Sequence, residues 1–252
     1  MRSYYRAGWS VLREAGASVL AYEVYPLGLA TASLPVVPPL WQTAAKPDVP
    51  ILFLHGLLHN TSTFAWIKQK LTLAGWHRFH ALNLSTTQHT IAQMSEQVLE
   101  AIEKARADFG VRQVDIVAHS MGGILARYAI QVLGAGPSVR TLITLGTPHQ
   151  GTELSRYSWI RNLKELAPES ETIRALQSAP ALTGTQACAV SGSLDVLLRP
   201  SQSAYWKGVR NIRLRGVGHA GLLFSNRVVQ IISAHLNPPL PAPVPRSNLQ
   251  AV

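Results

Sequence analysis

The sequence predicts an α/β fold with a mostly parallel central sheet flanked by helices. Short apolar or β-branched runs, such as those at 50–54, 114–117 and 139–145, alternate with stretches of helical periodicity. Strands that alternate with helices form parallel sheets with right-handed crossovers. The 252 residues, of which 47% are hydrophobic and 14% charged, suffice for one such domain with a sizeable core.

Composition limits the classes of partner. The single cysteine, Cys188, excludes an intrachain disulfide, as is typical of a reducing compartment. The chain has 23 Lys and Arg against 13 Asp and Glu, a formal charge of +10 that favours anionic partners such as an acidic membrane surface. We expect no nucleic-acid partner, because the chain has no block rich in Lys and Arg and no array of stacking aromatics.

The domain is expected to cover 47–236, between an N-terminal arm at 1–46 and a Pro-rich tail at 237–252. Within the arm, 24–45 carries no charge and could nearly span a bilayer. Its four prolines do not suit a lipid-exposed helix. No clean apolar run ends at a processing site, as a signal peptide would. We therefore expect a cytoplasmic or membrane-peripheral protein, with secretion left open.

The first half of the domain follows a strand–helix pattern. A buried strand at Pro50–Leu54 precedes a helix that begins near Thr61–Phe64, where hydroxyl side chains are candidate N-caps. The segment Arg78–Leu84 is the next predicted strand. The clearest helix covers His89–Phe109, where apolar residues recur with helical period and Gly110 provides a stop.

A tight strand-to-helix corner follows at 118–122, with the sequence Ala-His-Ser-Met-Gly. A β-branched strand precedes it and a helix follows, which is the context that a nucleophile elbow requires. So tight a turn needs small residues at Ala118 and Gly122, and Gly123 lets the helix approach closely. The turn exposes the Ser120 hydroxyl at a helix N-terminus, where free N–H groups favour negative charge. We therefore predict that Ser120 is a nucleophile.

The second half completes the sheet. A strand at Val139–Leu145 is followed by a helical insertion at 153–185, after which two more strands and a long helix are expected. These elements are predicted at Gln186–Val190, Asn211–Arg215 and Leu222–Leu236.

Candidate partners for Ser120 follow later strands. A serine needs a base to take its proton, and His219 lies in a glycine-rich loop after the last predicted strand. A carboxylate must orient that histidine, and Asp195 is the only acidic residue after Glu171. Because the carboxyl ends of parallel strands form the ligand site of such folds, these residues are expected to converge there. His119 is expected to point away from Ser120 and to be structural.

The oxyanion of acyl transfer needs two fixed donors. The backbone N–H of Met121, directly after the nucleophile, is one candidate. The N–H of Leu57, after the first strand, is the other, and Gly56 would let that backbone close over a substrate.

Several segments together resemble the α/β-hydrolase family, and more narrowly its bacterial lipase and triacylglycerol esterase branch. They are HG at 55–56, AHSMGG at 118–123, GTPHQGT at 146–152, SGSLD at 191–195 and GHAGLL at 218–223. The resemblance covers about residues 48–236 and implies an α/β-hydrolase fold and hydrolysis of carboxylic esters, with lipid or acyl-glycerol esters as substrates. It implies no cofactor. Many secreted relatives carry a calcium site, but no acidic residue lies between Asp195 and His219, so we expect no metal site.

The resemblance also implies a lid at the insertion. Trp159, Ile160, Leu163 and Leu166 share one apolar helical face, which could cover an acyl pocket or equally pack on the core as an ordinary helix. The candidates for the pocket lining are Trp159 and Leu163 from this insertion, and His55, Gly56 and His149 from the strand ends.

Two alternatives stay open. The same serine machinery would serve a thioesterase, an amidase or an acyltransferase, because an acyl-enzyme is common to all of them. A binding protein with a hydrolase fold and little turnover belongs to a different class, and the complete Ser, Asp and His set argues against it.

Overall fold

Six strands form one fully parallel sheet in the computed structural model of the protein, in the order β2-β1-β3-β4-β5-β6. The structure describes residues 48–158 and 161–237. The strands are β1 (Ile51–Leu54), β2 (Phe79–Leu82), β3 (Val114–His119), β4 (Val139–Leu145), β5 (Gln186–Gly192) and β6 (Arg210–Leu214). The predicted α/β fold with a parallel sheet is therefore confirmed.

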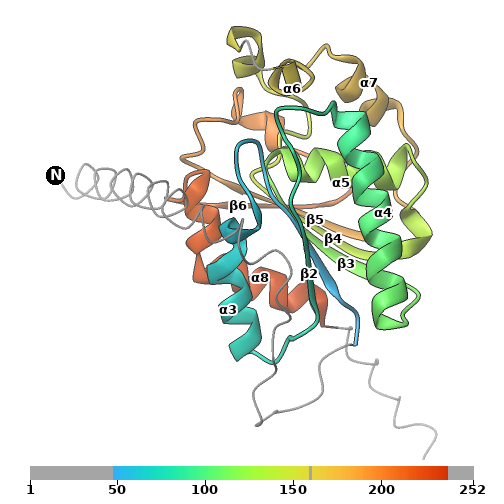
Figure 1. The fold of residues 1–252 in the computed structure, drawn as a ribbon. Helices are drawn as coiled ribbons and strands as arrows, with labels where there is room; N and C mark the ends of the chain where they lie inside the picture. The colour runs from blue at the N-terminus through green and yellow to red at the C-terminus, as the bar shows by residue number, and fades with distance from the viewer. Residues whose placement is uncertain (1–47, 159–160, 238–252) are drawn as a thin grey trace, which may run out of the picture.

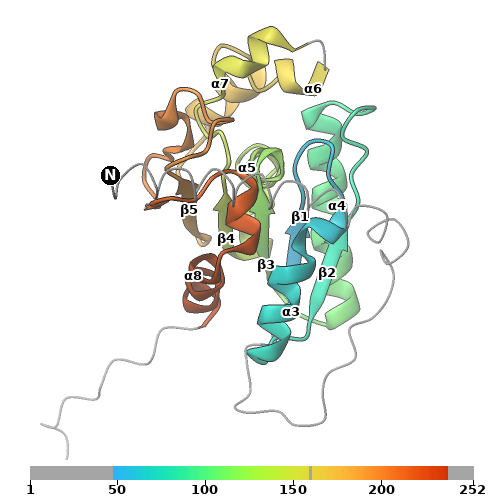
Figure 2. The same cartoon turned by 90° about the vertical axis from the view of Figure 1, so that its left-hand side faces the viewer.

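Helices cover both faces of this sheet (Figures 1 and 2). On one face lie α4 (Ile91–Phe109) and α5 (Met121–Gln131), and on the other lie α3 (Ala65–Leu73) and α8 (Asn226–Leu236). This three-layer arrangement is how parallel sheets bury both of their faces.

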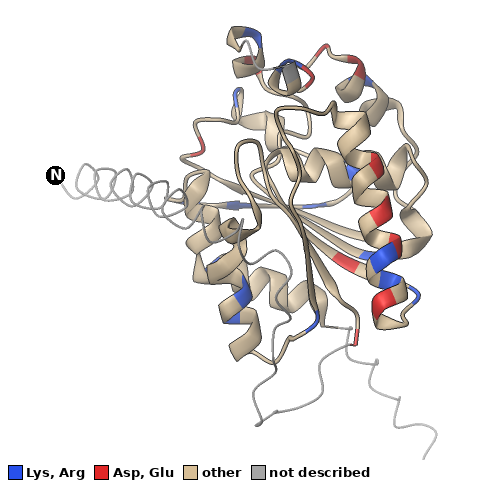
Figure 3. Ribbon diagram, viewed as in Figure 1, with Lys and Arg blue, Asp and Glu red and all other residues tan. Residues whose placement is uncertain are grey.

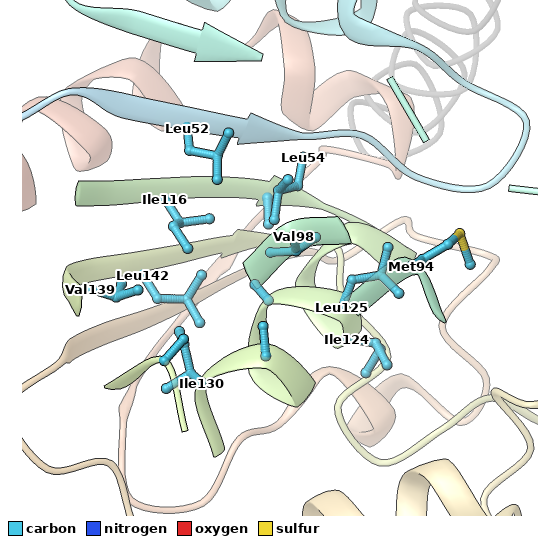
Figure 4. Packing of buried hydrophobic residues seen from close by; sticks show 14 of the residues in the cluster. Leu52, Leu54, Met94, Val98, Ile116, Ile124, Leu125, Ile130, Val139 and Leu142 are labelled. Atoms are coloured by element: carbon cyan, nitrogen blue, oxygen red, sulfur yellow. The ribbon is translucent and has the colours of Figure 1, made fainter. Parts of the chain in front are cut away.

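Each strand contributes to two hydrophobic cores, because neighbouring side chains of a strand point to opposite faces. In β1, Leu52 and Leu54 pack in the core that contains α4 and α5, whereas Ile51 and Phe53 pack in the core with α3 and α8. All four side chains are fully buried. Figure 4 shows the first core, with these labelled residues among its members: Leu52, Leu54, Met94, Val98, Ile116, Ile124, Leu125, Ile130, Val139 and Leu142.

The helix ends follow capping chemistry. Helix α4 begins with a capping box between Thr90 and Gln93 and ends at Gly110, whose φ of 63° is left-handed, so the predicted stop is confirmed. The expected caps at Thr61–Phe64 were wrong. That segment is a 3-10 turn, and Asn60 caps it by accepting a hydrogen bond of 3.0 Å from the N–H of Ser62. An amide oxygen one residue earlier satisfies the first donors.

The helix predicted at Leu222–Leu236 consists of two separate elements in the structure. Ala220–Phe224 form a 3-10 turn, and α8 starts only at Asn226 because Ser225 is extended, with φ −96° and ψ 119°. This break lets the residues after His219 turn back toward the sheet before the helix begins. Leu222 and Leu223 are fully buried in the core with α3 and α8.

The insertion lies beyond the carboxyl ends of the strands (Figures 1 and 2). It contains a 3-10 turn (Glu153–Tyr157), α6 (Arg161–Lys164) and α7 (Glu171–Ser178). Of the helix expected to carry Trp159, Ile160, Leu163 and Leu166 on one face, the described residues show a single turn, α6.

Three sequence expectations lie outside the described residues: the arm at 1–46, the tail from 238 onward, and the side chains of Trp159 and Ile160. Within the described ranges, no helix is long and apolar enough to cross a membrane. In Figure 3, where the ribbon is coloured by residue type, acidic residues gather along α4 with basic residues between them.

Candidate active site

Ser120 occupies the corner between β3 and α5 in a strained backbone conformation. Its φ of 55° and ψ of −126° place a non-glycine residue in a region that L-residues rarely adopt. Its own N–H donates to the carbonyl of Leu145 at 2.8 Å, which ties the corner to the end of β4. Such strain persists only where the surroundings enforce it, and it clusters at functional sites. This geometry is typical of a nucleophile elbow.

Close packing explains the glycines around Ser120. A Cβ on Gly122 would overlap the carbonyl oxygen of Leu54, and one on Gly123 would overlap the side chain of Thr147. The Thr147 hydroxyl donates to the carbonyl of Ser120 at 2.9 Å and so holds the corner from the β4 side. Sequence reasoning missed this role of Thr147, although its position directly after Gly146 at the end of β4 was a usable signal.

Asp195 and His219 form a hydrogen-bonded pair. The Asp195 Oδ2 atom lies 2.8 Å from Nδ1 of His219, and the side chains are only 1% and 11% exposed. The other carboxylate oxygen accepts the N–H groups of Leu197 at 3.0 Å and Leu198 at 3.3 Å. Because an ionised carboxylate only accepts hydrogen bonds, the proton lies on Nδ1, which leaves Nε2 of His219 as an acceptor.

Gly146 lies directly against this pair. A Cβ built on it would be 3.0 Å from Nδ1 of His219 and 3.2 Å from Oδ2 of Asp195, and its φ of 60° is left-handed. The backbone at the end of β4 therefore forms one wall of the Asp195–His219 contact. Only glycine meets both conditions without strain.

Two further histidines lie beside His219. The His119 ring centroid is 4.6 Å from that of His219 and 5.9 Å from that of His59. Burial holds the pKa of His119 well below its usual value, and burial followed by the charge of His219 lowers the pKa of His59 to about 4. Both rings are therefore neutral at neutral pH. The expectation that His119 is structural agrees with its full burial and its contact with the His219 backbone.

The first loop approaches Ser120 closely. A Cβ on Gly56 would be 2.8 Å from Cβ of Ser120, so the backbone at Gly56 and Leu57 adjoins the corner. Met121 is the first residue of α5, and the first N–H groups of a helix have no partner within it. These are the two amides expected to bind an oxyanion, and their role as donors stays a prediction.

His55 fastens the loop that carries Gly56. Its Nε2 accepts the N–H of Leu84 at 2.9 Å, so its proton is on Nδ1, which donates to the carbonyl of Gly56 at 2.9 Å. The ring is fully buried, and burial lowers its pKa. Both ring nitrogens are thus engaged in holding the loop.

Two other pocket candidates, His149 and Leu163, make contacts of their own in the structure, and their place in a substrate pocket stays a prediction. His149 is buried beside Arg127 and Trp206 and lines a cavity. Leu163 packs partly buried against the core with α4 and α5. A hydrogen bond connects the insertion to α4, because the Glu165 carboxylate accepts the N–H of Ile91 at 2.9 Å. Gating by this insertion stays a prediction.

No group of three or more His, Cys, Asp or Glu side chains among the described residues could hold a metal ion. The groups that the structure brings together around this corner are a hydroxyl at Ser120, the imidazole of His219 and the carboxylate of Asp195.

Sequence comparisons find enzymes that act on acyl bonds. A family model described as palmitoyl protein thioesterase matches residues 50–213. A triacylglycerol lipase of Burkholderia plantarii is 31% identical over 157 residues, which are 59% of this chain and 40% of that protein. A triacylglycerol lipase of Pseudarthrobacter phenanthrenivorans is 32% identical over 124 residues, 46% of this chain and 38% of that protein. The chain thus spans about two fifths of the length of these relatives.

Solved structures show the same architecture. The mature lipase of Bacillus licheniformis superposes with a TM-score of 0.68 at 19% identity, covering 80% of this chain and 96% of that one. Lipase B of Aspergillus fumigatus gives a TM-score of 0.63 at 20% identity, covering 74% of this chain and 53% of that one. These likenesses confirm the α/β-hydrolase fold that the motifs predicted.

Proposed function

The chain belongs to the palmitoyl protein thioesterase family, and on that premise we propose that it is a serine hydrolase that cleaves carboxylic esters through an acyl-enzyme. The carrying observation is the 2.8 Å contact between Asp195 and His219, next to a strained corner that presents Ser120. Those three residue types in those settings support the Ser-His-Asp mechanism.

In the first half-reaction, Nε2 of His219 takes the proton of Ser120 as the hydroxyl oxygen attacks the ester carbonyl. Asp195 holds the proton on Nδ1 and stabilises the imidazolium that forms. The tetrahedral intermediate then collapses, the bond to the alcohol breaks, and the alcohol leaves with the proton from His219. The acyl group is now esterified to Ser120.

The oxyanion needs stabilisation at the moment it forms. We assign this to the backbone N–H groups of Leu57 and Met121, which lie on the two segments that adjoin Ser120. Preorganised hydrogen-bond donors aimed at such a charge stabilise it by about 3–4 kcal/mol each. In the second half-reaction, water attacks the acyl carbonyl as His219 accepts its proton. The bond from the acyl carbon to the Ser120 oxygen then breaks, His219 returns the proton to that oxygen, and the carboxylic acid leaves.

Lipid or acyl-glycerol esters are the proposed substrates, because the curated relatives are triacylglycerol lipases. A thioester is a second candidate, favoured by the family model for palmitoyl protein thioesterase. The acyl-enzyme would be the same in both cases, and only the leaving group would differ.

Hydrolysis of p-nitrophenyl esters from acetate to palmitate tests the proposal on the full chain. We expect turnover in the wild type, a loss of at least a thousandfold in Ser120→Ala, and no change in the matched control Ser178→Ala, whose serine is exposed on α7. Activity that rises with chain length would support a lipid substrate. Substantial activity in Ser120→Ala would contradict the mechanism.

The leaving group is tested separately. The values of kcat/KM for p-nitrophenyl palmitate and for a palmitoyl thioester of a short peptide should be compared in the same preparation. A preference for the thioester would assign the thioesterase alternative, whereas a preference for the oxygen ester would assign the esterase. If neither substrate turned over and a fluorophosphonate did not label Ser120, the binding-protein alternative would replace both.

A further inference from the structure

A cavity that Ser120, Asp195 and His219 do not line lies beside α5. It has a volume of about 810 Å³ and opens between α5, α7 and the first residues of β5 and β6. Arg127 of α5 and Leu176 of α7 contribute to its wall, and so do Trp206, Lys207 and Arg210. Ser120, Asp195 and His219 do not line it, so the proposed hydrolase chemistry leaves this cavity unexplained.

The guanidinium of Arg127 is buried in the wall of this cavity. The residue is only 4% exposed. Its Nε donates to Oε1 of Gln131 at 2.9 Å, Nη2 donates to the carbonyl of Leu176 at 2.9 Å, and Nη1 donates to the carbonyl of His149 at 3.2 Å. Every one of these acceptors is neutral. Within the described part of the chain, none of these hydrogen bonds brings a negative charge to the guanidinium.

A buried charge is costly unless it is paired, and proteins normally pair it with an opposite charge. No acidic side chain among the described residues forms an ion pair with Arg127, and none of the residues that line the cavity is acidic. Burial is the cause that lowers the pKa of Arg127 to about 10, a value at which the group stays protonated at neutral pH.

Neighbouring rings fix the guanidinium in place. Its carbon lies 4.5 Å from the Trp206 ring centroid, and the His149 ring stacks on Trp206 at 4.6 Å. His149 Nδ1 faces Nη1 of Arg127 at 3.4 Å, so the histidine proton is on Nε2 and is donated to the Thr144 hydroxyl at 2.9 Å. His149 is thus a neutral acceptor.

One N–H group of the Arg127 guanidinium is not used by the hydrogen bonds described above. The contacts of Arg127 engage Nε–H, both N–H groups of Nη1 and one of Nη2, whereas a guanidinium has five N–H groups. One N–H of Nη2 has no acceptor among the described residues. Arg127 is thus a rigid, charged donor with a free position in the wall of a cavity.

We propose that this cavity binds an anionic amphiphile, a phosphate or carboxylate group carried on an apolar body. Arg127 would meet the anionic group, and Lys207 and Arg210, both exposed on the lining, would add positive charge at the entrance. Leu176, Leu182 and other apolar lining residues would contact the body of the ligand. A cavity of about 810 Å³ is far larger than a free phosphate needs.

The proposal does not depend on the hydrolase function, because the cavity and the candidate active site share no catalytic residue. Arg127 is nevertheless on the helix that Ser120 precedes, two turns away, so a ligand here would contact the same helix as the nucleophile.

Binding of monooctyl phosphate and of octanoate to the full chain, measured by calorimetry at fixed ionic strength, tests the proposal. Because Arg127 is buried and its loss could prevent folding, the informative variant is Lys207→Gln with Arg210→Gln. We expect this variant to bind at least tenfold more weakly than the wild type. The control, Arg112→Gln with Arg227→Gln, removes the same net charge at exposed positions outside the cavity and should bind like the wild type.

The probes distinguish the parts of the ligand. Tighter binding of one probe would identify the preferred anionic group, and octanol should not compete, because it lacks charge. Equal binding of inorganic phosphate and octyl phosphate would overturn the role of the apolar body. Unchanged affinity in the cavity variant, or an equal loss in both double variants, would overturn the site itself.

Discussion

His119 supports the backbone of His219: its Nε2 lies 3.3 Å from the His219 carbonyl oxygen, and the two rings lie 4.6 Å apart. The residue that precedes the candidate nucleophile therefore contacts the loop that carries the candidate base. Since Nε2 donates this bond, the proton of His119 is on Nε2. The contact links two corners that are 100 residues apart in the chain.

Removing this donor is expected to lower activity without removing any reacting group. In His119→Leu the buried carbonyl of His219 loses its partner, at a cost of about 1–3 kcal/mol, and the imidazole of His219 is held less firmly. We expect kcat to fall by about tenfold with little change in KM. His119→Gln carries an amide donor at a similar position and should restore most of kcat. Equal kcat in the leucine variant and the wild type would contradict the positioning role.

Asp195→Asn should separate orientation of the imidazole from folding. The amide can still accept from the N–H groups of Leu197 and Leu198, but its NH₂ favours the wrong tautomer of His219. We expect kcat to fall by about 10³- to 10⁴-fold while the unfolding transition in urea stays close to that of the wild type. Asp108→Asn removes an exposed carboxylate that pairs with Lys104 on α4, and it should leave kcat unchanged. An Asp195→Asn enzyme with near-normal turnover would refute the assignment.

Much of this architecture follows from local sequence. The strand Val139–Leu145 agrees residue for residue, because its β-branched and apolar residues, interrupted only by Arg140, continue until Gly146. The corner at Ser120 was predictable because Gly122 and Gly123 follow it closely, and glycine at such positions indicates that another segment approaches the backbone. A position where any Cβ would overlap a neighbouring backbone, such as Gly122, must be glycine whatever else changes.

Other features depend on contacts that no local pattern encodes. The Asn60 cap was missed because three hydroxyl residues follow it and each is a good capping residue by itself. Arg127 lies in a mostly apolar helix, and apart from Gln131 on the same helix its partners come from residues 20 or more positions later, at His149, Leu176 and Trp206. A charge inside an apolar helical stretch was the available signal, but its consequence could not be derived without the fold.

Gly146→Ala should damage the site through contact as well as strain. The new Cβ would lie 3.0 Å from Nδ1 of His219, so the Asp195–His219 pair must shift. Gly110→Ala is a matched control, because Gly110 has a similar φ of 63° but no heavy atom within 4 Å of the added carbon. Both variants should lose about 1–2 kcal/mol of stability from left-handed strain. Only in Gly146→Ala should kcat fall, by at least tenfold. A similar fall of kcat in Gly110→Ala would show that general destabilisation, and not contact with His219, lowers the activity.

Acid should destabilise the fold through its buried histidines. Burial lowers the pKa of His55, His119 and His149, so the folded protein keeps these rings neutral where the unfolded chain, with a histidine pKa of about 6.5, binds protons. Stability is therefore complete above pH of about 6.5 and falls below it, by up to about 1.4 kcal/mol per pH unit for each ring that stays neutral. Urea unfolding between pH 7.5 and 5 measures this slope. His119→Gln removes one such ring and should give a shallower slope than the wild type, and identical slopes would show that His119 does not contribute.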